Sequence, residues 1–156
     1  MKDVFWLVEG KLAGRSGPNK TPWDLQELAA NGIKVIVSLN DANQCDESAM
    51  AEVGILHRVF TLPDSIPPTL DDLAICTEIL PKILAFIAQC EADNLPVLIH
   101  CRSGKDRTGL MMAYYLMKNG AAPLHAVSQV RNVREIAFSA DGWDQFVFDV
   151  LYALQD

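Results

Sequence analysis

The sequence predicts an α/β fold in which helices flank a central, mostly parallel β-sheet, built as a single domain over residues 1–156. The first supporting observation is the alternation of short apolar, β-branched runs with longer segments of helical pattern. The second is the length of 156 residues, which is typical of one domain. The third is the hydrophobic share of 50%, which suffices for one core and excludes a disordered or collagen-like chain.

The first 60 residues alternate between expected strands and short helices. The strands share short runs of apolar, β-branched or aromatic residues and are expected at 4–8, 33–39 and 55–60. A Thr-Pro step at 21–22 and an Asn-Gly step at 31–32 bound a helix predicted over residues 22–30. A second short helix is expected over residues 46–53. Residues 11–20 contain two glycines and a proline, which predict a loop.

The second half of the chain is expected to be mainly helical. Residues 61–68 contain three prolines and predict an irregular loop. A helix is expected to begin at Thr69 and to run to about Asp93, with a kink at Pro81. Residues 97–100 are expected to form a short buried strand. The remaining helices are expected at 109–118, 123–134 and 140–154.

The charge of the chain limits its partners. Lys and Arg number 13 and Asp and Glu number 20, which gives a formal net charge of −7. Such a chain binds nucleic acid or anionic membranes poorly, so neither is expected as a partner. Pro81 and Lys82 interrupt the most apolar stretch, so no run approaches the roughly 18–20 residues of a membrane span and no stable membrane insertion is expected. Arg131 and Arg134 are expected to form ion pairs or to be solvated.

Cys45, Cys76, Cys90 and Cys101 form no CxxC pair and match no Cys/His spacing of a zinc site. The start of the chain lacks the apolar core of a secretory signal, so reduced thiols and a cytoplasmic location are expected. Cys76 and Cys90 are expected to lie in the cores of helices and Cys45 in a loop. Cys101 is the cysteine whose surroundings indicate chemistry.

The segment Val97–Gly109, V-L-I-H-C-R-S-G-K-D-R-T-G, carries the candidate chemistry. Five residues separate Cys101 from Arg107, and a helix is expected to follow directly. Backbone N–H groups of residues 102–107 and the helix N-terminus can surround a tetrahedral oxyanion. Gly104 permits a tight turn, and the guanidinium of Arg107 matches two phosphate oxygens. The expected phosphate-binding residues are Arg102, Ser103, Gly104, Lys105, Asp106 and Arg107.

The positive field of this loop also acts on the thiol at its centre. Cysteines in such settings have pKa values of roughly 3.5–7.5, so Cys101 is expected to be a preformed nucleophile. No metal and no cofactor is expected, because the loop itself supplies the positive charge. Arg102, Lys105 and Arg107 against Asp106 give the loop a charge of 3 − 1 = +2, which favours substrates with more than one negative charge.

The pattern H-C-x5-R-[ST]-G after a strand resembles the CX5R signature of the protein tyrosine phosphatase superfamily. The start F-W-L-V-E-G-K-L-A-G and the segment L-P-D-S-I-P-P resemble the small atypical dual-specificity phosphatases. The resemblance extends from about Phe5 to the C-terminal helix and implies a single-domain cysteine-phosphatase fold. It also implies hydrolysis, through a phosphocysteine intermediate, of phosphotyrosine and of phosphoserine or phosphothreonine in proteins or peptides.

The resemblance assigns a role to each residue of the motif. Cys101 would attack phosphorus, Arg107 would bind the phosphoryl oxygens and stabilise the transition state, and Thr108 would donate a hydrogen bond to the cysteine sulfur. His100 would support the loop from behind. Asp64, in the proline-bounded loop, would protonate the leaving oxygen and then act as the base toward water.

Asp106 is the alternative acid, or a helper of Asp64. The K-D-R-T-G variant resembles bacterial phosphatases that act on phosphotyrosine and phosphoinositides, in which the loop aspartate is a candidate participant. A carboxylate at this position would oppose the phosphate unless it faces outward, pairs with Lys105 or Arg102, or is protonated. The alternative function is therefore that of a phosphoinositide or inositol-phosphate phosphatase.

Two rival interpretations are weaker. A non-catalytic phosphate-binding module would lack the cysteine, the arginine or the acid, and this chain has all three. Rhodanese or arsenate reductase chemistry also uses a cysteine in an anion-binding loop. The Thr-Gly step after Arg107 and the distant, proline-bounded Asp64 argue against that chemistry.

Overall fold

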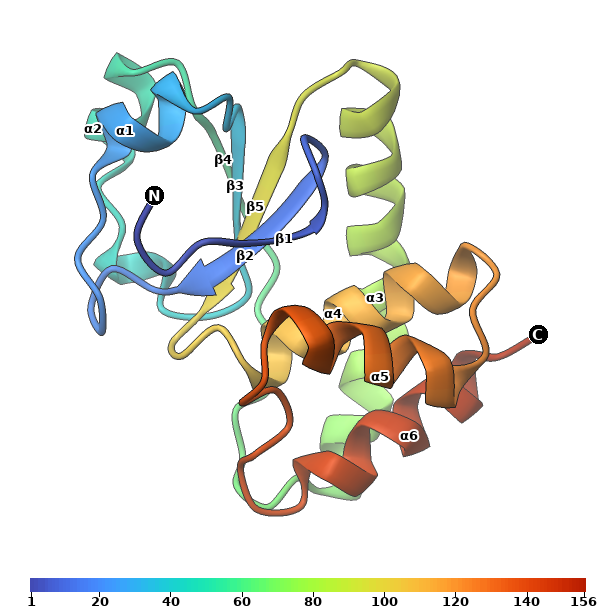
Figure 1. The fold of residues 1–156 in the computed structure, drawn as a ribbon. Coiled ribbons are helices and arrows are strands. Elements are labelled where there is room, and N and C mark those ends of the chain that lie inside the picture. Colours follow the sequence, from blue (N-terminus) through green and yellow to red (C-terminus); the bar gives the residue numbers. More distant parts are fainter.

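The computed structural model describes residues 1–156 and contains a five-stranded sheet between two groups of helices (Figure 1). The strands are β1 (Phe5–Val8), β2 (Leu12–Ser16), β3 (Val35–Ser38), β4 (Leu56–Val59) and β5 (Val97–Cys101). Their order across the sheet is β1-β2-β5-β3-β4. Only the β1–β2 pair is antiparallel, so the mostly parallel sheet predicted from the sequence is confirmed.

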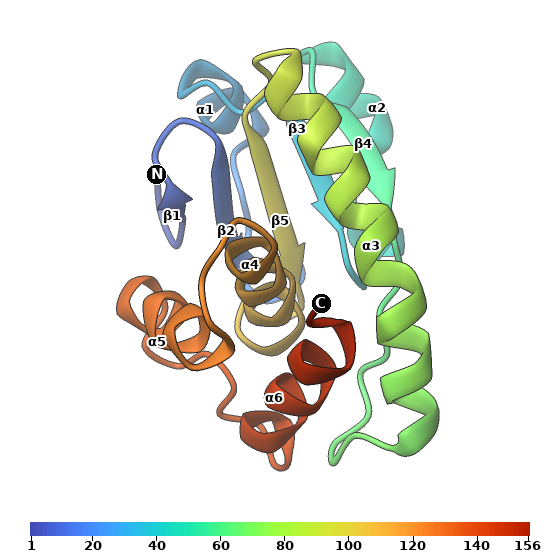
Figure 2. The same ribbon diagram turned by 90° about the vertical axis from the view of Figure 1, so that its right-hand side faces the viewer.

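The helices lie in two layers. They are α1 (Leu25–Ala30), the short 3₁₀ helix η1 (Ala42–Gln44), α2 (Glu47–Glu52), α3 (Leu70–Ala92), α4 (Asp106–Lys118), α5 (Pro123–Val133) and α6 (Trp143–Leu154). Figure 2 shows α3, α4, α5 and α6 in front of the sheet and α1 and α2 behind it. The larger hydrophobic core lies under the first group and a smaller one under the second.

Strand β5 lies in the middle of the sheet, and its side chains point alternately to the two faces of the sheet. All five of its residues are buried. Val97, Ile99 and Cys101 belong to the larger core, whereas Leu98 belongs to the smaller one. Because successive side chains of a strand point to opposite faces, His100 lies on the same side as Leu98. The side chains of the neighbouring residues His100 and Cys101 therefore point to opposite faces of the sheet.

The carboxyl ends of three parallel strands meet at one edge of the sheet. In the observed register Ser16 of β2 lies beside Cys101, and Ser38 of β3 lies beside His100. Ligands of parallel α/β sheets bind at this kind of edge. The register thus brings residues from three distant parts of the sequence to the end of β5.

The prediction of a loop over residues 11–20 is wrong for its first half, because Leu12–Ser16 forms β2. Gly14, Arg15 and Ser16 are weak strand formers, which hid the strand from the sequence pattern. Pairing with β1 on one side and β5 on the other holds β2 in the sheet. Phe5 and Met112 fill the space beside Gly14, where a Cβ would come within 2.7 Å of the Phe5 ring.

Three helix starts also differ from the prediction. Helix α1 begins at Leu25, because the carboxylate of Asp24 caps it by accepting the N–H of Glu27 at 3.1 Å. Helix α6 begins at Trp143 after Gly142, which has a φ of 82°. Helix α4 begins at Asp106 instead of residue 109, so three loop residues of the prediction belong to its first turn.

Helix α3 is continuous through Pro81 and spans 23 residues. Thr69 and Asp72 form a reciprocal capping box at its start. Cys76 and Cys90 are buried on its core face, as predicted. The expectation that no segment approaches the length of a membrane span is wrong, because an 18-residue window of α3 has a mean hydropathy of 1.6. By length and composition alone α3 could cross a membrane, a criterion that core helices also meet.

Candidate active site

The loop between β5 and α4 forms a cradle, defined here as the backbone of residues 101–107 (Figure 1). Cys101 is the last residue of β5, and Arg107 lies in the first turn of α4. The first N–H groups of a helix have no partner within the helix, and its dipole places partial positive charge there. The earlier start of α4 therefore adds the N–H groups of its first turn to the anion-binding loop.

Every carbonyl oxygen of residues 101–105 accepts a hydrogen bond from a donor outside the cradle. The donors are His100 Nδ1 to Cys101, the Gly17 N–H to Arg102, Ser16 Oγ and Arg134 Nη2 to Ser103, Arg134 Nε to Gly104, and the Gly109 N–H to Lys105, all at 2.7–3.1 Å. The C=O and N–H of one peptide plane point in opposite directions. Turning these carbonyls outward therefore turns the amide N–H groups inward.

Arg134, at the C-terminal cap of α5, is the main support of the cradle. Besides its bonds to Ser103 and Gly104, it donates to Ser16 Oγ at 3.2 Å and pairs with Asp3 at 2.9 Å. Burial raises the pKa of the Asp3 carboxyl, but hydrogen bonds from Ser16 and Arg134 outweigh burial and lower it. The ion pair fits the sequence expectation. The contacts with the cradle were missed, because Arg134 lies 30 positions from Gly104.

Gly104 is required where the sequence predicted a tight turn. Its φ of +64° lies in the left-handed region, and a Cβ would stand 2.4 Å from the carbonyl carbon of Arg15. Gly17 is similarly confined, since a Cβ there would stand 2.7 Å from the Cys101 carbonyl oxygen. These close approaches let the end of β2 hold the cradle against β5.

Cys101 lies at the base of the cradle and is buried. The hydroxyl of Thr108 donates to its sulfur at 3.1 Å, which is the contact implied by the resemblance. The Nε of Arg107 is buried and has no hydrogen-bond partner within the chain. An unpaired buried donor is costly, and an oxyanion in the cradle would satisfy it. The site thus combines a thiol, a hydroxyl donor and a free guanidinium donor.

His100 supports the loop from behind, as expected. Its ring is fully buried and donates to the Cys101 carbonyl at 3.1 Å. Trp23 packs edge-on against it, with ring centroids 5.3 Å apart. Burial lowers the pKa of His100 to about 4, so the ring is neutral at neutral pH.

Asp106 is engaged by Lys105 and by the connection between α5 and α6. Its carboxylate is buried, pairs with Lys105 at 3.5 Å and lies 3.5 Å from the N–H of Ala140. Pairing with Lys105 is one of the arrangements that the sequence allowed. Lys105 also donates to Ser139 Oγ at 2.9 Å, so its ammonium bridges the cradle and the α5–α6 connection.

Lys20 adds a cation at the mouth of the cradle that the sequence motif did not indicate. Its Nζ donates to Ser103 Oγ at 3.0 Å. The buried Arg15 holds this part of the chain by donating to the Thr21 carbonyl. Arg102 is exposed at the same loop. The cradle therefore carries three cations besides Arg107: Lys20 bound to Ser103, and Arg102 and Lys105 of the loop itself.

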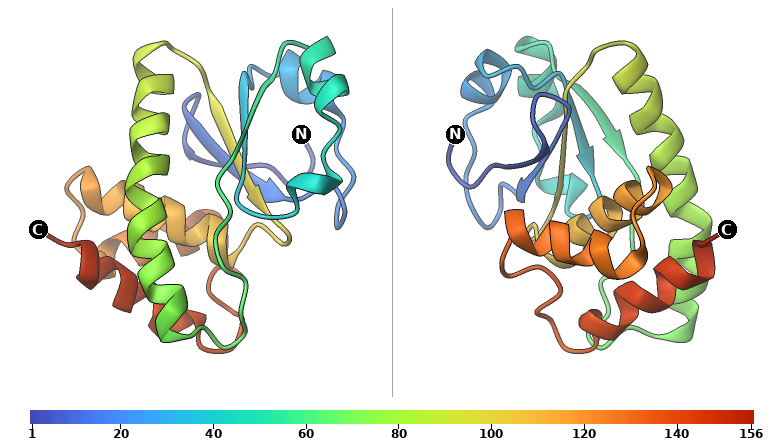
Figure 3. Two further views of the ribbon diagram at one scale, coloured as in Figure 1. Left: turned by 180° about the vertical axis from the view of Figure 1, so that it is seen from behind. Right: turned by 45° about the vertical axis from the view of Figure 1, so that its right-hand side comes forward.

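Asp64 is exposed and makes no hydrogen bond or ion pair within the chain. Its loop, residues 61–68, lies beside the connection before α6 (Figure 3), where Trp143 Nε1 donates to the Ser65 carbonyl at 3.1 Å. The Leu62 N–H also bonds to the Leu39 carbonyl at 2.8 Å. The loop is thus fixed at both sides of Asp64 while the carboxylate stays free. Its catalytic role remains a prediction.

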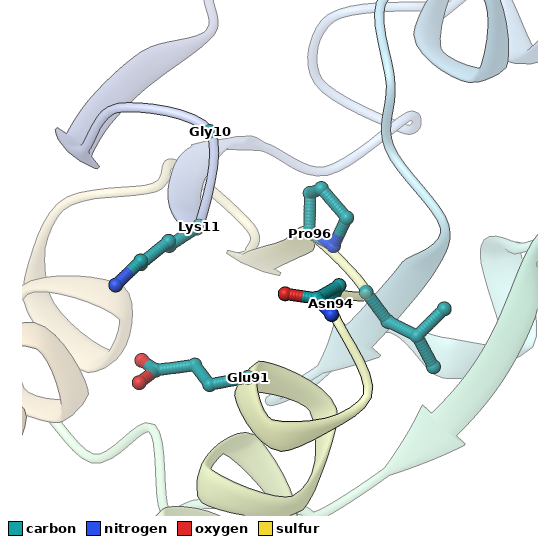
Figure 4. Close-up of a pocket in the computed structure, with 6 residues that line it drawn as sticks. Gly10, Lys11, Glu91, Asn94 and Pro96 are labelled. Atoms are coloured by element: carbon teal, nitrogen blue, oxygen red, sulfur yellow. The ribbon is translucent and has the colours of Figure 1, made fainter.

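A separate polar pocket of about 120 Å³ lies at the other end of the sheet. Gly10, Lys11, Glu91, Asn94 and Pro96 line it (Figure 4). Pro96 directly precedes β5, whereas the cradle follows the last residue of that strand. This pocket therefore takes no part in the chemistry of the cradle.

Comparison with known families gives a match over most of the chain. The family model described as Tc-R-P, polymorphic toxin system, DSP-PTPase phosphatase, matches residues 12–121. This range runs from β2 through the cradle to the end of α4. It therefore includes the strands and the loop that build the site.

Curated relatives are similar over part of their length. The dual specificity protein phosphatase OPG106 of Vaccinia virus (strain Western Reserve) is 34% identical over 42% of this chain and 42% of its own length. The dual specificity protein phosphatase CDC14AB of Danio rerio is 27% identical over 75% of this chain and 19% of its own length. The chain thus matches less than half the length of these relatives.

Solved structures share the fold. Tk-PTP in the active form superposes with a TM-score of 0.77 at 21% identity, covering 97% of both chains. Human DUSP28 gives a TM-score of 0.72 at 19% identity, covering 100% of this chain and 97% of its own. At these identities the likeness shows the fold alone, and it confirms the predicted α/β cysteine-phosphatase fold.

Replacing Arg134 tests the support of the cradle. Arg134→Met removes the side-chain donor of the Gly104 carbonyl and leaves the Ser103 carbonyl with Ser16 Oγ alone, so we expect the affinity for inorganic phosphate to fall about tenfold or more. Titration calorimetry measures this affinity. Arg131→Met is the matched control, because Arg131 stacks over Phe138 at 5.5 Å and does not contact the cradle. Equal phosphate affinity in both folded variants would contradict the proposed support.

The buried His100 predicts a pH dependence of stability. Its folded pKa of about 4 lies below the unfolded value of 6.5, so the unfolded chain binds more protons between these values. The free energy of unfolding should therefore fall by about 3 kcal/mol as the pH drops from 6.5 to 4. Urea unfolding at several pH values measures the slope. His100→Asn should flatten it, while the exposed His125→Gln should keep it; identical slopes in wild type and His100→Asn would refute the assignment.

Proposed function

The chain belongs to the DSP-PTPase phosphatase family of polymorphic toxin systems, and on that premise we propose that it is a cysteine-dependent phosphomonoester hydrolase. Its proposed substrates are phosphotyrosine and phosphoserine or phosphothreonine in proteins. One observation carries the proposal: a buried thiol lies under a ring of inward-facing amides, beside the unpaired Nε of Arg107. We further propose that this activity serves a toxin system and that the domain works in the cytoplasm.

The first step transfers the phosphoryl group to sulfur. The Cys101 thiolate attacks phosphorus, a sulfur–phosphorus bond forms, and the bond to the leaving oxygen breaks. Arg107 and the cradle amides bind the three non-bridging oxygens and stabilise the charge that develops on them. An acid gives its proton to the leaving oxygen, so the alcohol or phenol departs neutral.

The second step hydrolyses the phosphocysteine. The same carboxylate, now ionised, takes a proton from water as its oxygen attacks phosphorus. The sulfur–phosphorus bond breaks, inorganic phosphate forms, and the thiolate is regenerated. The Thr108 hydroxyl, 3.1 Å from the sulfur, stabilises that departing thiolate with a hydrogen bond.

We assign the acid to Asp64 in preference to Asp106. Asp106 is buried and engaged by Lys105 and the Ala140 N–H, so its carboxylate is turned from the centre of the cradle. Asp64 is exposed, unpaired and held on a loop whose flanking residues are bonded to the body of the domain. A free carboxylate on a fixed loop suits an acid that must meet a substrate.

The cations at the mouth favour substrates with a second anionic group. Lys20, Arg102 and Lys105 lie at the cradle loop in a chain whose net charge is −7. Phosphopeptides with acidic neighbours fit this arrangement, and they are the first candidate. Phosphoinositides and inositol phosphates are the second, because the ammonium group of Lys20 binds Ser103 of the cradle and Lys105 adds another ammonium group from the cradle itself.

Substituting the nucleophile tests the proposed activity. Cys101→Ser should abolish phosphate release from phosphotyrosine peptides, because a serine hydroxyl is not ionised near neutral pH, while inorganic phosphate still binds. Phosphate release is compared by kcat/KM across acidic phosphopeptides, phosphoinositides and inositol phosphates, with and without chelator. Turnover within tenfold of wild type in Cys101→Ser, or loss of activity with chelator, would refute the mechanism.

A second pair of variants separates the two carboxylates. Asp64→Asn should slow phosphotyrosine hydrolysis by roughly 10²–10⁴-fold and remove the basic limb of the kcat profile, because tyrosine with a pKa near 10 needs a proton to leave. An aryl phosphate with an acidic phenol should be affected far less. Asp106→Asn should mainly change KM. The reverse pattern would assign the acid to Asp106 and favour a phosphoinositide substrate.

A further inference from the structure

A chain of hydrogen bonds leads from the surface to the nucleophile loop, on the face of the sheet opposite Cys101. His100 Nδ1 contacts the Cys101 carbonyl at 3.1 Å, and His100 Nε2 lies 2.6 Å from Ser38 Oγ. Ser38 Oγ lies 2.7 Å from His57 Nε2, and His57 Nδ1 lies 2.9 Å from Glu47 Oε1. The sequence analysis noted only His100 among these side chains.

The Cys101 carbonyl fixes the direction of the hydrogen bonds that connect His100, Ser38 and His57. A carbonyl oxygen can only accept, so the neutral His100 carries its proton on Nδ1 and accepts at Nε2. Ser38 has one hydroxyl proton and must donate it to His100, because the 2.6 Å contact needs a hydrogen between the atoms. Ser38 therefore accepts from His57 Nε2–H at 2.7 Å.

Glu47 forms the surface end of the chain. His57 Nδ1 lies 2.9 Å from Glu47 Oε1, so the ring faces a carboxylate at the surface. The His57 side chain is 6% exposed and that of Glu47 is 72% exposed. The hydrogen-bonded chain thus begins at the exposed carboxylate of Glu47 and ends at the Cys101 carbonyl.

Other groups near the chain do not replace these bonds. Cys45 Sγ lies 3.7 Å from Ser38 Oγ and 3.6 Å from His100 Nε2, and a thiol is a weak donor. Burial raises the pKa of the Cys45 thiol, so it stays protonated. Asp41 and Arg15 act on His100 only through their charge. Ser38 is therefore the strong donor to His100.

We propose that Ser38 and His57 are positioning residues for the nucleophile loop, which hold the His100 ring so that the peptide between Cys101 and Arg102 presents its N–H to the cradle. This proposal rests on the proposed phosphatase function. The Cys101 carbonyl accepts from His100 alone among the side chains, so the orientation of that ring fixes the peptide plane. Without the Ser38 hydroxyl, a buried ring nitrogen of His100 loses its donor.

The consequence is electrostatic. The N–H of Arg102 belongs to the same peptide unit as the Cys101 carbonyl. A tilt of that plane therefore moves the positive end of the peptide dipole away from both the sulfur and a bound oxyanion. Loss of one supporting hydrogen bond should lower kcat/KM by about threefold to tenfold. It should also make the thiolate harder to form.

The test measures thiolate formation directly, with iodoacetamide as the probe of Cys101. In Ser38→Ala and His57→Leu the pH of half-maximal alkylation should rise by about half a unit to one unit. His57→Gln should recover most of the loss, because its amide can place an N–H donor near the position of Nε2. The exposed His125→Leu on α5 is the matched control and should leave the alkylation curve unchanged.

A merely structural role predicts a different result. In that case Ser38→Ala and His57→Leu would lower the melting temperature without moving the alkylation curve, and His57→Gln would resemble His57→Leu; either result overturns the proposal. The readout is independent of turnover. If the wild-type protein released no phosphate, the proposed function would fail, while a shifted alkylation curve would still support the positioning role of Ser38 and His57.

Discussion

The site depends on one constraint, which is that the carbonyl oxygens of residues 101–105 all point out of the cradle and are all bonded there. A loop of this length has no secondary structure to fix its peptide planes, so each plane needs an external donor. Where one carbonyl turned inward, it would place a negative dipole beside the phosphate and remove an N–H from it. The backbone donors Gly17 and Gly109 and the side chains of Ser16, His100 and Arg134 therefore fix the direction of the peptide dipoles in the cradle.

The parallel sheet supplies two of these donors, Ser16 and His100, and Gly17 directly follows β2. Its register aligns the ends of β2, β3 and β5, so Ser16 and Ser38 come to lie beside Cys101 and His100. The side chains of β5 alternate, so Cys101 and His100 lie on opposite faces of the sheet. The thiol faces the helices that carry Thr108 and Arg134, whereas His100 faces the smaller core with Ser38 and His57.

The positive charges of the site are concentrated at the cradle loop. A chain of net charge −7 gathers Lys20, Arg102 and Lys105 at one loop and leaves the buried Nε of Arg107 unpaired there. Asp106 is accommodated there because its carboxylate is turned toward Lys105. An acidic protein can thus concentrate positive charge at an anion site.

The sequence by itself determined the parallel α/β class and the H-C-x5-R-T-G loop, because periodicity and a short contiguous motif are local properties. It also indicated that Gly104 must take a special conformation, and its φ of +64° agrees. Tertiary structure alone decided β2, whose weak strand formers are held by two neighbouring strands. It alone brought Lys20 and Arg134 to the cradle and Ser38 and His57 to the chain behind His100. Strand register and helix packing, which depend on long-range contacts, set those positions.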